Sequence, residues 1–209
     1  MLFTGAMAAA GHAAAALPVP RGDRIEFRII RHGDEIGRHT VTFDRRGGAL
    51  MVRITVDALV TLLSLPIVRY ALRATETWQG ETLVGLTSET DKNGRHQWAS
   101  ARRTDEGLVV LGSQTRRYIA PEPAGTTSYW DKRALARPMI SMEDGVLLRP
   151  KVAEQRPEAI PTAAGAPTVA DHYVLSGAFN VELWYDRTDT WASLAYSAPD
   201  GSTVHYERL

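Results

Sequence analysis

The chain contains no cysteine in its 209 residues. This absence excludes disulfide bonds, cysteine nucleophiles and thiolate metal sites, but it does not fix the compartment, because exported proteins without disulfides are common. Excess charge of either sign is also missing, since 24 basic side chains (Lys and Arg) balance 24 acidic ones. A nucleic-acid binder that depends on overall charge is therefore not expected, and we predict no nucleic-acid partner.

Motifs that carry well-known chemistry are absent as well. The sequence has no G-x-S-x-G elbow, no H-E-x-x-H helix, no phosphate-binding glycine loop and no dinucleotide fingerprint. The histidines after residue 20 show no spacing suited to local metal chelation; they are His32, His39, His96, His172 and His205. The sequence therefore predicts no metal site and no cofactor, and it identifies no catalytic residue.

The segment 1–20 differs from the rest of the chain because it holds no charged residue. Its small residues at 13–16 match the cleavage pattern of a secretory signal peptide, although no basic residue precedes the apolar part. We interpret the segment as a signal peptide, which implies a periplasmic protein, or alternatively as a disordered alanine-rich tail. In either case residues 21–209 are expected to form a single β domain.

Residues 49–79 have the clearest structural pattern in the chain. Apolar side chains occupy every second position from Ile54 to Leu62 and again from Val68 to Ala74. A period of two with β-branched and aromatic residues is typical of a strand with one buried face. We predict two long strands joined near Leu65 and Pro66, where proline cannot donate to a ladder. Because such strands exceed the usual length of about 5–6 residues, we expect them to curve.

Turn signals at short intervals extend this pattern along most of the chain. Asn93-Gly94 is a strong hairpin signal, and a meander of about eight strands is expected to end near Ile119. Ser128 followed by Asp131 resembles a capping box, which predicts a short helix at 129–136. The predicted fold is all-β: a single curved antiparallel sheet (β-spiral, half-barrel or barrel-like) of about a dozen strands with one short helix. Its expected core includes Val56, Val60, Tyr70, Leu72, Trp130, Leu183 and Leu194.

Several short motifs resemble one protein family. They are Thr127-Ser128-Tyr129-Trp130, Leu183-Trp184-Tyr185-Asp186, Asp200-Gly201-Ser202 with Tyr206, and Arg31-His32-Gly33 through Ile36-Gly37. With them, roughly residues 24–208 resemble an uncharacterised domain-of-unknown-function family of exported proteobacterial proteins. More distantly, that family is similar to envelope proteins built as a β-spiral or half-barrel and to periplasmic lipoprotein carriers. The resemblance implies export and a curved antiparallel sheet, and it implies no catalytic residue.

The leading functional interpretation is a non-enzymatic envelope protein that binds an apolar or amphipathic, lipid-like molecule in the concavity of its sheet. Sheets of about eight or more strands can hold a small ligand between their walls. The candidate ligand-binding residues are Leu62, Leu63, Leu65, Ile67, Tyr70, Trp98, Trp130 and Trp184. The uncharged tip at 62–67 is either an opening that contacts lipid, or a segment covered by the predicted helix.

Two other classes of function remain open at this stage. An enzyme, such as a hydrolase, lyase or isomerase, requires polar residues from separate strands to converge; the candidates are Glu76, Glu89, His96, Asp131 and Glu182. For Glu76 we prefer a position at the sheet rim beside Arg73 or Arg103 over an acid–base role. A scaffold would instead bind another envelope protein through a sheet edge.

Two basic pairs, Arg102-Arg103 and Arg116-Arg117, offer an additional surface. They suit an anionic head group or a membrane surface. The alternative, which we prefer, is a solvated face balanced by Glu89, Asp105 and Glu106.

Overall fold

The structure is a computed structural model that describes residues 17–62 and 65–209, with the side chains of residues 61–67 outside the described part. One antiparallel sheet of 14 strands dominates it, and a 3-stranded sheet packs beside it. The large sheet is curved but not closed. The predicted all-β class with a single curved sheet is therefore confirmed, and closure into a barrel does not occur.

The large sheet runs in the order β12-β14-β15-β16-β17-β1-β2-β3-β4-β5-β6-β7-β8, and β13 also pairs with β14. Its strands are β1 (Arg24–Arg31), β2 (Asp34–Arg46), β3 (Ala49–Leu62), β4 (Leu65–Gln79), β5 (Thr82–Lys92), β6 (Arg95–Thr104), β7 (Gly107–Gly112), β8 (Thr115–Ala120), β12 (Lys151–Glu154), β13 (Glu158–Ile160), β14 (Thr168–Ser176), β15 (Val181–Tyr185), β16 (Trp191–Ser197) and β17 (Thr203–Arg208). Pairing of β17 with β1 joins the C-terminal hairpins to the N-terminal meander.

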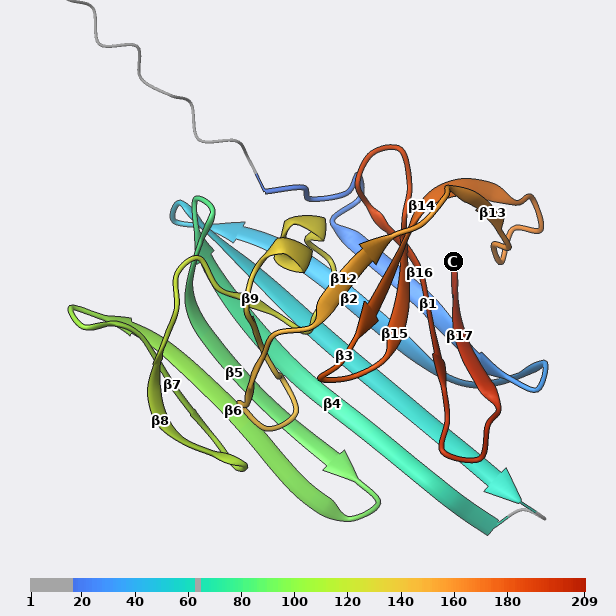
Figure 1. Ribbon diagram of the computed structural model, residues 1–209, viewed down its shortest axis with the longest axis horizontal. Coiled ribbons are helices and arrows are strands. Elements are labelled where there is room, and N and C mark those ends of the chain that lie inside the picture. Colours follow the sequence, from blue (N-terminus) through green and yellow to red (C-terminus); the bar gives the residue numbers. More distant parts are fainter. Residues whose placement is uncertain (1–16, 63–64) are drawn as a thin grey trace, which may run out of the picture.

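The segment between β8 and β12 forms an insert that lies against one face of the sheet (Figure 1). It contains β9 (Gly125–Thr126), the 3-10 helix η1 (Lys132–Ala136), β10 (Met139–Ile140) and β11 (Leu147–Leu148). Buried insert residues such as Trp130, Met139 and Ile140 join one core with the apolar residues of the sheet. We call the face that they cover the inner face; the opposite, outer face carries alternating polar residues.

The helix differs in position and type from the expectation. It begins at Lys132 as a 3-10 helix, and its N-cap is Asp131, whose side chain accepts a hydrogen bond from the backbone N–H of Arg133 at 3.1 Å. Ser128 is not the cap, because its hydroxyl lies 2.8 Å from that of Thr126. Tyr129 has a φ of 60°, which is incompatible with a right-handed helix, so the predicted start at 129 is wrong.

The two long strands are confirmed as β3 and β4, of 14 and 15 residues. Pairing with β2 ends at Ala58, and pairing with β5 ends at Tyr70, so the hairpin extends past both neighbours. Side chains on this extension are poorly covered: Leu59 is 48% exposed and Val68 is 38% exposed.

Most of the expected core is confirmed, with two exceptions, Val60 and Tyr70. Val56, Leu72, Trp130, Leu183 and Leu194 are buried. Val60 and Tyr70 are only half-buried. The insert reaches Tyr70 through Glu143, whereas Val60 and Val68, farther along β3 and β4 on the inner face, are half-buried and exposed.

Candidate ligand site on the inner face

One row of residues crosses the inner face where the insert ends. Consecutive strands place Tyr206 beside Ile29, Ile29 beside Gly37, Gly37 beside Ala58, and Ala58 beside Tyr70. Gly37 is required there, because a Cβ atom at this position would clash with the backbone carbonyl of Asp57. Tyr206 and Tyr70 therefore flank Ile29, Gly37 and Ala58, of which the last two carry very small side chains or none.

The insert adds a carboxylate and a third tyrosine above this row. The Tyr70 hydroxyl donates to Glu143 Oε1 at 3.0 Å, and Lys92 Nζ lies 3.6 Å from Glu143 Oε2. The ring of Tyr129 lies 6.0 Å from that of Trp191, which in turn lies 6.1 Å from that of Tyr206. We call Tyr70, Tyr129, Glu143, Tyr196 and Tyr206 the tyrosine site.

The backbone at Tyr129 is strained and held in place. A φ of 60° is unusual for an aromatic residue, and such strain concentrates at functional positions. Tyr185 stabilises this conformation, because its hydroxyl donates to the Tyr129 carbonyl at 2.8 Å. The fold therefore maintains an unfavourable conformation that directs one side chain into the site.

The loop that carries Glu143 is fixed to the sheet by hydrogen bonds on both sides of it. Ser88 Oγ donates to the Met142 carbonyl at 2.6 Å, and the Tyr118 hydroxyl donates to the Gly145 carbonyl at 2.9 Å. Gly112 lets the loop approach, because a Cβ there would clash with the Asp144 carbonyl. The carboxylate of Glu143 is thus held by a fixed backbone.

The tyrosines of the site are neutral hydrogen-bonding groups. Burial raises the pKa of Tyr70, Tyr129 and Tyr206, and the negative charge of Glu143 raises it further for the first two. Burial also raises the pKa of Tyr196, against the opposing effect of Arg31. Each phenol therefore keeps its proton at physiological pH and can both donate and accept.

Three of these hydroxyls are available to a ligand. Those of Tyr129, Tyr196 and Tyr206 make no hydrogen bond to another described residue, and they are not among the described polar atoms that are sealed from solvent without a partner. Tyr196 is 39% exposed on the same inner face. The site thus presents unsatisfied phenols around one carboxylate at the edge of an apolar face.

Of the predicted ligand-binding residues, only Tyr70 is placed in this site by the structure. Trp130 is buried between the insert, to which it belongs, and the sheet, whereas Trp98 and Trp184 lie on the outer face, so these tryptophans do not line a common pocket. The side chains of Leu62, Leu63, Leu65 and Ile67 lie outside the described residues.

The residues next to the helix η1 contact β4 at Glu76. Trp130, next to η1, donates from Nε1 to Glu76, and Glu76 pairs with Val52. Val52 and Leu62 are ten residue steps apart, which is roughly 33 Å along the strand. The predicted tip at 62–67, and with it the choice between a covered and an open tip, lies outside the described side chains.

Glu76 is buried rather than exposed at the rim, which corrects the preferred expectation. Its Oε2 accepts hydrogen bonds from the indole N–H groups of Trp78 at 2.9 Å and Trp130 at 2.8 Å, and its Oε1 accepts one from the Thr126 hydroxyl. These partners join β4 to the insert. The carboxylate therefore acts as a structural acceptor within the core.

The other candidates for an enzyme do not converge with it. Asp131 is bound to Arg133, at 2.9 Å between Oδ1 and Nε. Glu89 and His96 are exposed on the outer face, and Glu182 contacts His172 at 2.8 Å on the same face. The predicted catalytic set is thus distributed over both faces of the sheet.

The basic pairs are partly neutralised, and of the three expected acidic partners Glu106 takes part. Arg103 pairs with Glu122 at 2.7 Å, and Arg117 pairs with Glu106 at 2.6 Å. Arg102 and Arg116 are exposed.

Within residues 17–62 and 65–209, no group of three or more His, Cys, Asp or Glu side chains is placed to hold a metal ion. No helix within the same ranges is long and apolar enough to cross a membrane.

Together, these features define a class of protein: an open antiparallel sheet that curves around its own insert and leaves an aromatic site on the uncovered part of the inner face. The comparison with protein families identifies the group. Residues 27–209 match the family described as domain of unknown function DUF6134, and the chain belongs to this family. This confirms the family resemblance, while the more distant likeness to β-spiral proteins and lipoprotein carriers stays a prediction. None of the curated proteins compared with the chain matches it.

Proposed function

We propose that the tyrosine site binds an amphipathic, lipid-like molecule. The observation that carries the proposal is the row from Tyr206 to Tyr70, in which Gly37 adds no side chain and Ala58 presents only a methyl group beside Tyr70. Ligand sites are usually mainly apolar, with a few well-placed polar groups, and this arrangement has that composition.

The polar end of the ligand belongs at the phenols. Tyr129, Tyr196 and Tyr206 offer hydroxyls without described partners, and Glu143 has one oxygen that only Lys92 approaches, at 3.6 Å. Because phenols both donate and accept, they suit hydroxyl, ester or phosphate oxygens equally well. The polar group is thus held at the boundary between the insert and the open sheet.

The apolar end belongs along the uncovered inner face. Beyond the insert this face carries half-buried or exposed apolar side chains: Ala58, Val60, Val68, Phe179 and Ala198. By contrast, Val52 and Ile54 beneath the insert are 0% and 1% exposed. A hydrocarbon chain lying there would cover the apolar surface that the insert leaves open.

Filling the row is the test of this proposal. Ala58→Trp places an indole between the two tyrosines, and we expect it to weaken binding of the neutral probe N-phenyl-1-naphthylamine by at least about tenfold, or 1.4 kcal/mol. Thr40→Trp is the matched control, because Thr40 lies on the outer face of β2. Fluorescence titration of three proteins decides the outcome: equal affinity in wild type and Ala58→Trp contradicts the proposal.

We also propose that the protein acts in the periplasm, on the basis of the uncharged, alanine-rich segment 1–20. Residues 1–24 fused to a β-lactamase without its own leader are expected to confer ampicillin resistance on a Gram-negative host. If the fused β-lactamase accumulates only in the cytoplasm and the cells stay sensitive to ampicillin, export is contradicted.

A further inference from the structure

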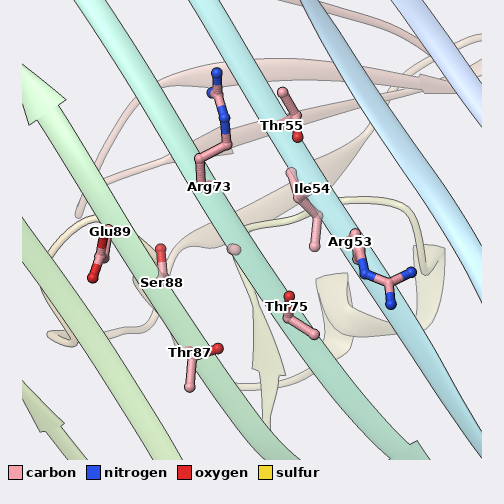
Figure 2. Close-up of a pocket in the computed structure, with 9 residues that line it drawn as sticks. Arg53, Ile54, Thr55, Arg73, Thr75, Thr87, Ser88 and Glu89 are labelled. Carbon is pink, nitrogen blue, oxygen red and sulfur yellow. The ribbon is translucent and has the colours of Figure 1, made fainter.

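The outer face of the sheet contains two adjoining hollows, independent of the tyrosine site. One, of about 280 Å³, lies over β3, β4 and β5 and is lined by Arg53, Thr55, Arg73, Thr75, Thr87 and Glu89, together with backbone of the intervening residues (Figure 2). The other, of about 490 Å³, lies over β4 to β7. Thr75 and Thr87 line both hollows, so the two form one continuous depression.

A single row of side chains connects the two hollows. Cross-strand register places Arg53 beside Thr75, Thr75 beside Thr87, Thr87 beside Ser100, and Ser100 beside Leu111. Figure 2 shows the first three of these on neighbouring strands. The row begins with a guanidinium and ends with a leucine that is 41% exposed. Four strand spacings separate its ends, about 19 Å.

The positive charge at the first end is only weakly compensated. Arg73 is occupied, because it donates to both oxygens of Asp57 at 2.8 Å. The carboxylate nearest to Arg53 is that of Asp44, at 3.7 Å, and Asp44 is held more closely by Arg46, at 2.7 Å. Two guanidiniums thus share one carboxylate, and Arg53 borders the hollow with surplus charge.

The second hollow is mainly apolar and has a gap in its floor. Val109 and Leu111 line it, and Arg102 contributes its aliphatic stem beside Gly85. A Cβ atom at Gly85 would meet its neighbours only at ordinary contact distances of 3.6 Å and more. A side chain would therefore fit at position 85 without a clash, and its absence leaves space in the hollow.

We propose that this outer row binds a single-chain anionic amphiphile. The head group, a carboxylate or sulfate, lies at Arg53 and accepts hydrogen bonds from Thr75 and Thr87. The hydrocarbon chain crosses the strands through the apolar hollow toward Leu111. Glu89 borders the polar hollow and disfavours additional negative charge, so a head group with one charge fits best. We infer this class of ligand because the surplus positive charge of Arg53 adjoins an apolar hollow.

Isothermal titration with dodecanoate and with the nonionic dodecyl maltoside, both below micelle formation, tests the assignment. Gly85→Leu fills the hollow and is expected to weaken both ligands by at least about tenfold. Arg53→Gln is expected to weaken dodecanoate by about tenfold to a hundredfold, as for a lost charged hydrogen bond, and to leave the maltoside unchanged. Arg38→Gln on the outer face of β2 is the matched control, with both affinities retained.

Three results would overturn the proposal. If Gly85→Leu leaves both affinities unchanged, the apolar hollow does not take part in binding. Ser100→Leu is a second variant that fills the hollow, for use if Gly85→Leu does not fold. If Arg102→Gln abolishes dodecanoate binding and Arg53→Gln does not, the head group binds at Arg102, beside the apolar hollow, and not at Arg53. Self-association of wild type that Gly85→Leu abolishes, without ligand binding, identifies the row as a contact between two copies instead. Ala58→Trp is expected to leave dodecanoate binding at this row unchanged, which separates it from the inner site.

Discussion

Glu76→Leu is expected to lower the free energy of unfolding by about 3–5 kcal/mol, because it leaves three buried donors without an acceptor. The indoles of Trp78 and Trp130 and the hydroxyl of Thr126 all donate to this carboxylate in the core. Leucine replaces the side chain with apolar atoms of similar volume, so packing is largely kept while these hydrogen bonds are lost. Urea denaturation followed by tryptophan fluorescence measures the effect.

Glu76→Gln is the matched control, and it separates hydrogen bonding from charge. Its amide oxygen can accept from both indoles, while its amide nitrogen can donate to the Thr126 hydroxyl. We expect it to stay within about 1 kcal/mol of wild type. A Glu76→Leu protein as stable as wild type would show that the insert does not dock through this carboxylate.

His39→Leu is expected to remove an acid-dependent loss of stability. His39 is fully buried beside Phe27, Trp191 and Tyr206, and neither ring nitrogen has a partner among the described residues. Burial lowers the pKa of His39 from 6.5 to about 3. The folded state therefore keeps this imidazole neutral where an unfolded chain would protonate it.

The direction of the effect follows from proton binding. Between pH 6.5 and about 3 the unfolded state binds the extra proton, so stability falls as the pH falls. The loss approaches about 1.4 kcal/mol per pH unit in this window. Denaturant unfolding from pH 4 to pH 8 should therefore give a shallower pH dependence for His39→Leu, with the two slopes equal above pH 7. Equal slopes throughout the range would show that His39 does not contribute this dependence.

The strands could be predicted from the sequence because their signals are local. Alternation from Ile54 to Ala74 depends only on which side chains share a face, and β3 and β4 follow it closely. The helix was misplaced for a related reason: Ser128 and Asp131 have the spacing of a capping box, yet Ser128 bonds to Thr126 and Asp131 becomes the cap. Local spacing alone does not reveal such a competing partner.

The tyrosine site could not be derived locally, because its parts come from three strands (β4, β16 and β17) and the insert. Nothing near Tyr70 in the sequence indicates that Glu143, 73 residues later, accepts its hydrogen bond. Likewise the partners of Glu76 lie 50 and 54 residues away. A usable signal did exist, since Tyr129 and Tyr206 belong to the motifs that carry the family resemblance. These motifs alone do not show that strand register brings Tyr206 and Tyr70 into one row.

Native mass spectrometry of the gently purified full-length chain tests the central claim, ligand binding at the tyrosine site, most directly. Wild type is expected to carry a noncovalent adduct of lipid mass that organic solvent extracts, and Thr40→Trp is expected to carry it as well. Ala58→Trp should be found without the adduct while unfolding at a similar denaturant concentration. A wild-type protein that is free of adduct and also fails to take up N-phenyl-1-naphthylamine would contradict the account.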